Sequence, residues 1–281
     1  MLRAIDVHTH LNTPEALAHD RFRDQRERYF PGSALGAPLA ETAAMYRQAE
    51  MKAIILPVNK ESSLGEPFIG NDYVADVVRR FPDVFVGFAG ADPWQGQAAV
   101  NELERAVTEL GLKGLKLVPP TQAFFPNDRR FYPLYAKCVE LDIPIIFHTG
   151  HSGIGVGMLG GGGIRLKYCQ PIFLDDVAAD FPDLTIIGAH PSWPWHDEML
   201  SVMLHKANVY MDLSGWRPKY FPQSVVQYAN TLLQDKMLFG TDYPALTPQR
   251  WLDDFAAVPF RDAVRPKILL ENARRVLKLD D

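Results

Sequence analysis

The chain has few cysteines and no long apolar run, and both absences exclude whole classes of protein. Only Cys138 and Cys169 occur among the 281 residues, too few for a disulfide framework and suited to a reducing compartment. No apolar segment approaches the ~18 residues that a membrane span requires. The first residues enter an apolar strand pattern directly, without a basic and then apolar signal segment. We therefore expect a soluble, cytoplasmic protein.

Positive charge is also scarce. The chain carries 29 Lys and Arg against 34 Asp and Glu, which gives a formal net charge of −5. Proteins that bind nucleic acid or an anionic membrane usually present a basic patch or a net positive charge. The composition points away from nucleic acid and membranes, and towards a small-molecule partner. There is no charge block or low-complexity tail, so we expect one domain over residues 1–281.

Apolar, β-branched runs alternate with helical patterns along the whole chain. Strands are expected at residues 4–8, 53–58, 84–89, 114–118, 143–148, 185–189, 209–213 and 237–240. Helices are expected at 38–50, 71–81, 96–110, 131–141, 171–181, 194–206, 223–234 and 265–277. This alternation, in a chain of this length, is typical of an α/β protein with the (β/α)8 TIM-barrel fold.

Two histidines, His8 and His10, close the first expected strand in the segment Ile5-Asp-Val-His-Thr-His. Side chains at positions i and i+2 of a strand project from the same face. Two imidazoles can thereby converge on one divalent cation. The alternative is an ordinary pair of surface or core histidines.

Four further polar residues fall at the ends of later strands. Lys116 lies late in the fourth strand, and His148 ends the fifth. His190 follows the sixth strand, and Asp242 follows the eighth. The carboxyl ends of barrel strands form the face that carries the active site in this fold. Burying so many ionisable groups together is costly unless a cation organises them, so the sequence predicts a metal site.

This order of residues resembles the amidohydrolase superfamily. The phrases Lys113-Gly-Leu-Lys-Leu117, Phe147-His-Thr-Gly150, Ala189-His-Pro191 and Phe239-Gly-Thr-Asp-Tyr-Pro244 are similar to those of its amidohydrolase-2 branch. That branch includes aminocarboxymuconate-semialdehyde decarboxylase, aromatic-acid decarboxylases and lactone hydrolases. The similarity runs from Ile5 to the terminal Glu271-Asn-Ala-Arg274 segment. Because the chain begins at the first strand, we do not expect the flanking β-sandwich of longer superfamily members.

The resemblance implies a role for each of these residues. His8, His10, His148 and Asp242 would bind one divalent metal ion, with Zn²⁺ expected and Mn²⁺ as the alternative. His190 would be the catalytic acid–base group beside that ion, and Asp242 would share in proton transfer.

Lys116 leaves the number of metal ions open. It stands where binuclear relatives have a carbamylated lysine that bridges two metals. Beside a single cation, an unmodified Lys116 would have a lowered pKa or would bind a substrate anion. The branch is usually mononuclear, but the sequence alone does not decide between the two forms.

Loop residues near the expected rim form a second group of candidates. His151 and Trp193 are expected to contact the substrate, with loop packing as the alternative. Seven glycines fall within residues 153–163, which predicts either a lid or a plain flexible connector. Arg165 and Lys167 follow this segment, where they would bind an anionic group of the substrate or lie on a solvated loop.

These features predict a metal-dependent hydrolase, in which a metal-activated water attacks a small carboxylated substrate derived from aromatic catabolism. Non-oxidative decarboxylation on the same ligands is the alternative, and a metal-binding barrel without turnover is the third possibility. Val118 replaces a histidine found in many relatives, which predicts a more apolar pocket near the fourth strand. The resemblance also implies a homodimer.

Overall fold

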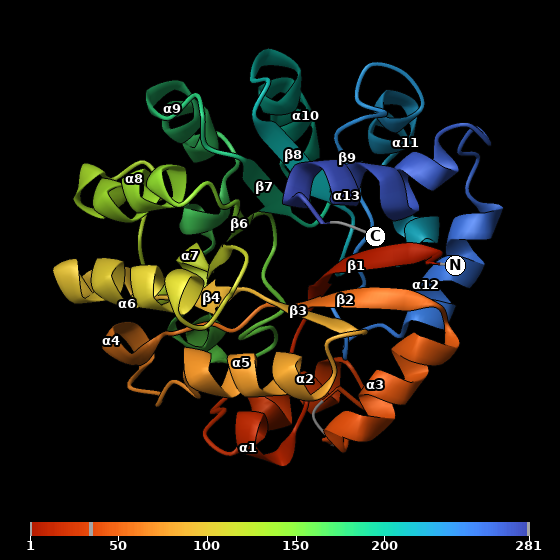
Figure 1. Cartoon of the computed structure of the whole chain (residues 1–281). Helices are drawn as coiled ribbons and strands as arrows, with labels where there is room; N and C mark the ends of the chain where they lie inside the picture. Colours follow the sequence, from red (N-terminus) through yellow and green to blue (C-terminus); the bar gives the residue numbers. More distant parts are fainter. Residues whose placement is uncertain (1, 34–35, 280–281) are drawn as a thin grey trace.

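The computed structural model describes residues 2–33 and 36–279, which form a ring of parallel strands surrounded by helices (Figure 1). The strands are β1 (Ala4–Thr9), β2 (Met51–Ile55), β3 (Phe85–Gly87), β4 (Ala89–Gly90), β5 (Leu115–Leu117), β6 (Ile145–His148), β7 (Ile186–Ala189), β8 (Val209–Asp212) and β9 (Met237–Leu238). Strands β1 to β3 form one sheet and β4 to β9 a second, each in chain order. The predicted (β/α)8 barrel is confirmed.

The first seam between the two sheets joins β9 to β1 and closes the barrel beside the two N-terminal histidines. The Val7 amide donates to the Phe239 carbonyl at 3.0 Å. Further along, the Asp242 amide donates to the His8 carbonyl at 2.9 Å. This seam therefore holds the end of β1 against the segment that follows β9.

The second seam corrects the sequence prediction, because the third expected strand is divided into β3 and β4. Strand β3 pairs with β2, whereas β4 pairs with β5. Phe88 lies between them, and its amide still donates to Ile55 at 3.0 Å. Its ring fills the space beside Gly114, where a Cβ would lie 2.3 Å from Cε2 of Phe88. The chain changes strand partner at this bulky buried residue.

Helices cover the outside of the ring. They are α1 (Pro14–Leu17), α2 (Arg23–Tyr29), α3 (Leu39–Gln48), α4 (Glu61–Leu64), α5 (Asn71–Arg80), α6 (Gln97–Thr108), α7 (Pro119–Gln122), α8 (Tyr132–Glu140), α9 (Phe173–Asp180), α10 (His196–His205), α11 (Gln223–Ala229), α12 (Pro248–Ala257) and α13 (Asn272–Leu277). Helix α12 and the short helices α1, α2, α4 and α7 are absent from the expected elements. Helix α12 did carry a signal, because the Thr247 hydroxyl caps its first turn and Pro248 begins it.

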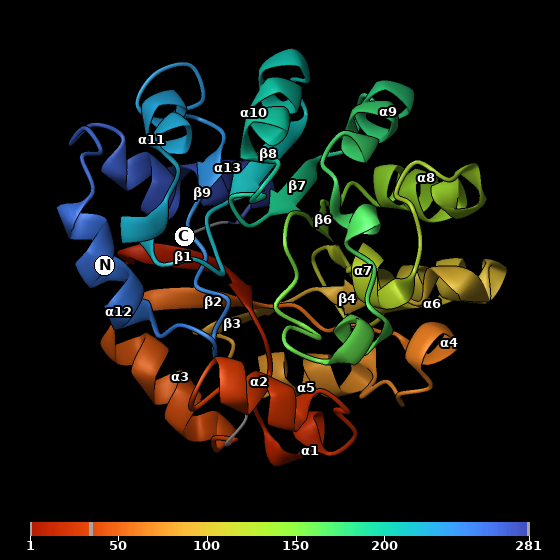
Figure 2. The same ribbon diagram turned by 180° about the vertical axis from the view of Figure 1, so that it is seen from behind.

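The last expected helix is a π-helical turn at Lys267–Glu271 followed by α13. Helix α13 crosses one end of the barrel (Figure 1), where Val276 and Leu277 pack with Ile5 and Leu238. The opposite end faces the viewer in Figure 2, with α1, α2 and the loop after β6 in front. The polar strand ends therefore open towards the face of Figure 2.

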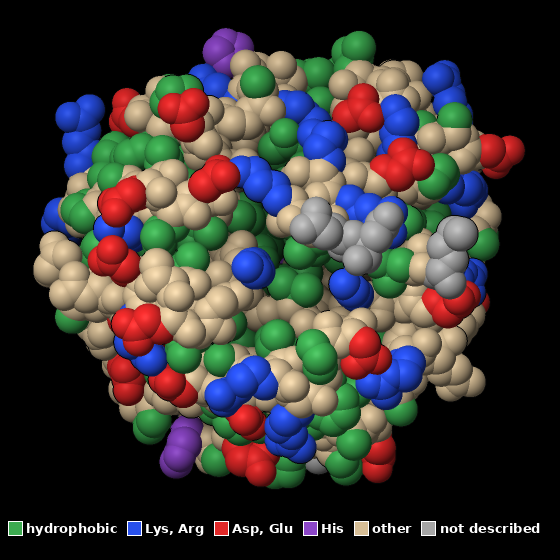
Figure 3. Space-filling view, viewed as in Figure 1, with side chains coloured by type: hydrophobic (Ala, Val, Ile, Leu, Met, Phe, Trp, Pro, Cys, Tyr) green, Lys and Arg blue, Asp and Glu red, His purple; other side chains and the backbone are tan. Residues whose placement is uncertain are grey.

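The end covered by α13 has a mixed surface. Figure 3 shows acidic and basic side chains interspersed over this face. Among the described residues, no helix combines the length and the apolar character that crossing a membrane requires.

Candidate metal centre and active site

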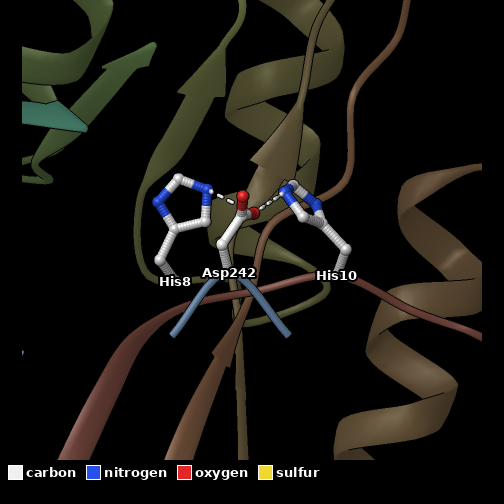
Figure 4. A group of neighbouring side chains, drawn as sticks. All are labelled: His8, His10 and Asp242. Atoms are coloured by element: carbon white, nitrogen blue, oxygen red, sulfur yellow. Dashed lines mark ion pairs between the residues drawn. The ribbon is translucent and has the colours of Figure 1, made fainter. Parts of the chain in front are cut away.

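Three of the predicted ligands meet at the seam between β1 and β9. Figure 4 shows the Asp242 carboxylate between the rings of His8 and His10. Its Oδ1 lies 3.2 Å from His10 Nε2 and 3.6 Å from His8 Nε2. His8 is buried, and the other two residues are half-buried. Two imidazole nitrogens and one carboxylate oxygen therefore converge on one point, as the His-x-His spacing predicts.

The backbone is held in unusual conformations after two of the strands, at Asp242 after β9 and at His190 after β7. Asp242 has φ of 65° and His190 has φ of 74°, a region that residues other than glycine rarely occupy. Such strain persists only where the surroundings impose it, and it is frequent at functional sites. Gly240 permits the close approach, because a Cβ there would lie 3.0 Å from Cβ of His8.

A buried carboxylate, Asp6, ties the two sides of this seam together. It accepts hydrogen bonds from the His8 amide (3.2 Å) and the Thr241 amide (2.9 Å). It also accepts from the hydroxyls of Thr241 (2.5 Å) and Tyr46 (2.8 Å). Burial raises the pKa of Asp6 to about 7, although these hydrogen bonds act in the opposite direction. Asp6 thus joins the backbone of β1 to the segment that contains Asp242.

The hydrogen bonds at Nδ1 of His8 and His10 determine which ring nitrogen of each histidine carries no proton and can bind a metal ion. His10 Nδ1 lies 2.9 Å from the Leu56 carbonyl, which can only accept, so Nδ1 carries the proton. His8 Nδ1 lies 2.9 Å from Asp212 Oδ2 and donates in the same way. In both rings the lone pair is left on Nε2, the atom that faces Asp242. Such support by a neighbouring acceptor is typical of metal-binding histidines.

Asp212 is a functional residue that the sequence analysis misses. It ends β8 and is fully buried. Burial alone would raise its pKa, but His8 and then His190 and Lys116 hold the pKa of Asp212 well below its usual range. The carboxylate is therefore ionised and accepts from His8. The sequence does contain a signal for Asp212, because this carboxylate lies near the end of an expected strand. Asp242 is identified from the same kind of position.

His148 and His190 form the next part of the cluster. His148 Nδ1 lies 3.1 Å from His190 Nε2. His148 Nε2 is buried and has no hydrogen-bond partner within the part of the chain that the structure describes. Buried polar atoms are nearly always paired, so this nitrogen is suited to a ligand that the protein itself does not supply. The donor atoms that lie within 4.8 Å of one another are those of His8, His10 and Asp242, a set that fits a Zn²⁺ or Mn²⁺ ion. His148 is not within that distance of all three, so its place as a fourth ligand stays a prediction.

Lys116 lies inside the same cluster. It is almost fully buried, and its Nζ lies 3.3 Å from His8 Nε2. Burial lowers the pKa of Lys116 to about 8, although Asp212 and Asp242 act to raise it. Burial and the Lys116 charge also lower the pKa of His8 to about 3. His8 is therefore a neutral imidazole at physiological pH, as a metal ligand must be.

A second group of possible ligands, formed by His8, His190 and Asp212, is occupied by a hydroxyl. Ser214 Oγ lies 3.0 Å from His8 Nδ1 and 2.9 Å from His190 Nδ1, and it donates to Asp212 Oδ1. The Ser214 hydroxyl therefore fills the space between these three side chains and hydrogen-bonds to all of them. This group does not include Lys116, so it does not decide how many metal ions the site binds.

The rim residues are only partly brought together. The His151 ring lies 5.5 Å from the Trp193 ring, which lies 5.8 Å from Trp216. Trp193 is 45% exposed, so these rings form an aromatic wall that is open to ligands. Arg165 and Lys167 are exposed, and Lys167 Nζ lies 5.3 Å from the Phe125 ring. Substrate contacts by His151, Trp193 and Arg165 stay predictions.

The glycine-rich segment 153–163 has a defined conformation. Gln25 of α2 donates from Nε2 to the Gly153 carbonyl at 3.1 Å and accepts from the Gly155 amide at 3.0 Å. Residues Gly160 to Gly162 have φ of 58° to 62°, which makes a left-handed turn that only glycine tolerates. The segment is therefore anchored on α2, at the face where the strands end (Figure 2).

Comparisons with known proteins agree with this geometry. A 2-keto-4-carboxy-3-hexenedioate hydratase from Sphingobium sp. is 30% identical over 226 residues, which are 68% of this chain and 65% of that protein. A gamma-resorcylate decarboxylase from Polaromonas sp. is 23% identical over 254 residues, 75% of each chain. The chain thus spans slightly less than two thirds of the hydratase.

Solved structures share the fold over nearly the whole chain. An uncharacterised TIM-barrel protein from Bordetella bronchiseptica has a TM-score of 0.80 and 29% identity, and the match covers 99% of each chain. A 5-carboxyvanillate decarboxylase from Novosphingobium aromaticivorans, solved with bound manganese, has a TM-score of 0.72 and 20% identity, covering 99% of this chain and 97% of that one. The amidohydrolase family model, Amidohydro_2, matches residues 5–279. The chain is therefore a member of the amidohydrolase family.

Proposed function

We propose that this protein is a metal-dependent carboxy-lyase that releases CO₂ from a small aromatic acid. The observation that carries the proposal is His190, an imidazole held at 3.1 Å from His148 and next to the ligand cluster. The gamma-resorcylate and 5-carboxyvanillate decarboxylases named above support the reaction class. One Mn²⁺ or Zn²⁺ ion per chain, held by His8, His10, His148 and Asp242, completes the proposed site.

The protein's own groups would carry the proton transfer. A bound divalent cation would supply positive charge that orients the oxygen substituents of the substrate. His190 gives a proton to the ring carbon that bears the carboxylate. The carbon–carbon bond then breaks, its electron pair restores the aromatic ring, and CO₂ leaves. Burial lowers the pKa of His190, so its protonated form is a stronger acid but a smaller fraction of the protein at neutral pH.

Two neighbouring groups would orient the substrate for that step. Lys116 is buried beside His8, where its ammonium can hold an oxygen of the substrate. The aromatic rings of Trp193 and Trp216 supply a flat apolar surface for a substrate ring. Strong binding of the departing carboxylate would oppose its release, so Lys116 is assigned to a substituent that stays on the product.

Hydration of an unsaturated acid is the second candidate, because the hydratase relative is 30% identical over 68% of the chain. The same imidazole would protonate a carbon of the double bond while a water oxygen adds to its neighbour. Hydrolysis, the expectation from the sequence, uses the same ligands. The two relatives and the decarboxylase named above are not hydrolases by name, so we rank hydrolysis third.

The experiment that separates these reactions measures CO₂ and water incorporation together. The Mn²⁺-loaded protein is incubated with gamma-resorcylate, 5-carboxyvanillate and an unsaturated carboxylated diacid in H₂¹⁸O. One CO₂ per substrate consumed, absent in His190→Asn, supports the carboxy-lyase. Consumption with ¹⁸O in the product and no CO₂ overturns it in favour of hydration or hydrolysis. Mass analysis separates those two, because hydration leaves one product and hydrolysis cleaves the substrate.

A further inference from the structure

We infer that Ser214 is a positioning residue that sets the protons of the histidine cluster so that His148 offers a bare nitrogen to the metal ion. The inference rests on the metal centre of the proposed function, and it goes beyond the ligands themselves. Ser214 is fully buried and follows β8, within hydrogen-bond distance of His8, His190 and Asp212. It is not itself a ligand in this arrangement.

The direction of each hydrogen bond follows from the single proton on the Ser214 hydroxyl. Asp212 Oδ1 accepts from the backbone amides of His190 (3.2 Å) and Ser214 (3.0 Å), so this oxygen is an acceptor and the Ser214 hydroxyl must donate to it. The lone pairs of the hydroxyl then face His190 Nδ1 at 2.9 Å. A nitrogen approaches an oxygen lone pair this closely only when it carries a proton. The Nδ1 of His190 is therefore protonated, and in the neutral ring its Nε2 is bare.

The same reasoning gives the position of the ring proton on His148. The bare Nε2 of His190 lies 3.1 Å from His148 Nδ1, which must therefore donate. A neutral His148 has one ring proton, so its buried, unpartnered Nε2 carries a lone pair. This lone pair is available to bind a metal ion. The position of the proton on His148 is thus fixed by a chain of hydrogen bonds that runs from Asp212 through Ser214 and His190. No metal ion is needed to fix it.

The opposite proton order is unfavourable because of Asp212. If His190 Nε2 carried the proton, Ser214 would have to donate to His190 Nδ1. The Ser214 oxygen would then have no proton to donate to Asp212. Two hydrogen-bond acceptors would face each other and repel. His148 would also place a proton on its unpartnered Nε2, where it would exclude a cation. Ser214 and Asp212 therefore select the metal-receptive state.

Metal binding tests this without any substrate. Metal-free protein is titrated with Mn²⁺ alone against a chelating dye. Ser214→Ala should raise the dissociation constant about 10- to 100-fold, the usual effect of removing a group that supports a metal ligand. Nitrogen-15 NMR of the metal-free protein should show His148 protonated at Nδ1 in the wild type, and at Nε2 in a substantial fraction of Ser214→Ala.

Ser192→Ala is the matched control. Ser192 is equally buried, but its hydroxyl contacts Thr149 Oγ1 at 2.7 Å rather than a ring nitrogen. This variant should bind Mn²⁺ as the wild type does. Asp212→Ala removes the acceptor of the Ser214 hydroxyl and should weaken Mn²⁺ binding, so it is the second test variant if Ser214→Ala does not fold. Wild-type affinity in a folded Ser214 or Asp212 variant, or equal weakening in Ser192→Ala, overturns the inference. A protein that passes this test but releases no CO₂ refutes only the proposed reaction.

Discussion

At the scale of single residues, His148 contacts His190 through Nδ1, while its buried Nε2 has no hydrogen-bond partner among the described residues. We expect His148→Ala to lower metal content well below one ion per chain and to abolish most of the activity. The reason is that an open site with three ligands holds a divalent ion less tightly than one with four. Elemental analysis of the purified variant is the measurement, and full occupancy with normal turnover would remove His148 from the ligand set.

His190 should behave differently, because it contacts a proposed ligand but is not assigned as one. His190→Asn removes the imidazole that accepts from His148, so Mn²⁺ affinity should fall about as much as in Ser214→Ala, but the site should still fill at saturating Mn²⁺. Its turnover number should fall about 10²- to 10⁴-fold, the usual contribution of a general acid–base group. Metal content and steady-state kinetics are measured on the same sample. If the ion does not bind even at saturating Mn²⁺, His190 is a ligand and not the proton donor.

The residues of the cluster could be predicted from the sequence to different degrees. His8, His10, His148, His190 and Asp242 each stand at a strand end, and the fold brings those ends together. Asp212 and Ser214 could not be assigned in the same way. Their role depends on His8, which is 204 positions from Asp212 along the chain. Only the closed barrel shows which buried polar group accepts from which ring, because sequence spacing carries no such information.

At the scale of structural elements, the seam between β1 and β9 contains a carboxyl group that should make stability depend on pH. The pKa of Asp6 is raised from 3.8 to about 7. The folded state therefore holds a proton that the unfolded state releases above about pH 4. Stability from this group is present at low pH and is lost as the pH rises from about 4 to about 7.

Asp6→Asn isolates that effect. The variant keeps the shape of the side chain but has no titratable group. We expect the free energy of unfolding of the wild type, minus that of the variant, to fall by a few kcal/mol between about pH 4 and 7. Urea unfolding at several pH values gives this difference. A difference that rises with pH would show that Asp6 is ionised throughout and that its hydrogen bonds outweigh its burial.

The glycine segment offers a second test at this scale. Gly162 has φ of 61°, and a Cβ there would lie 2.8 Å from Cε1 of Phe22. Gly162→Ala should therefore release the segment from Phe22 and raise KM more than it lowers kcat, because the segment lies at the open face of the barrel. Faster amide exchange at residues 153–163 is the structural readout.

Gly161→Ala is the control for the backbone alone. Gly161 has φ of 62°, but a Cβ there would meet nothing within 4 Å. Both substitutions incur the same left-handed strain of roughly 1–2 kcal/mol, so the difference between them reports the contact with Phe22. Equal effects of the two substitutions on exchange and KM would exclude an anchoring role for that contact.

At the scale of the whole molecule, the barrel could be predicted because its strands are buried on both faces and read as apolar runs. The break at Phe88 could not, because it depends on space beside Gly114, a residue on the neighbouring strand. Helices α1 and α2 precede the first expected helix. Helix α1 has only four residues, and α2 carries mostly polar residues, so neither shows a periodic apolar pattern. Their position over the open face follows from tertiary contacts such as the Gln25 amide with the glycine segment.

The proposed ligands come from β1, from the end of β6 and from the segment after β9, so a bound ion would connect both sheets of the barrel across their seam. A ligand that binds only the folded state stabilises it by about 2.7 kcal/mol at 100 times its dissociation constant. For a chain of this size, that corresponds to a rise in Tm of roughly 5 °C. We expect Mn²⁺ added to the metal-free protein to produce such a rise, measured by scanning calorimetry. His148→Ala should reduce the rise, since it removes the ligand contributed by β6. An unchanged Tm in the wild type, with Mn²⁺ in excess, would show that the ion does not join the two sheets and would contradict the four-ligand site.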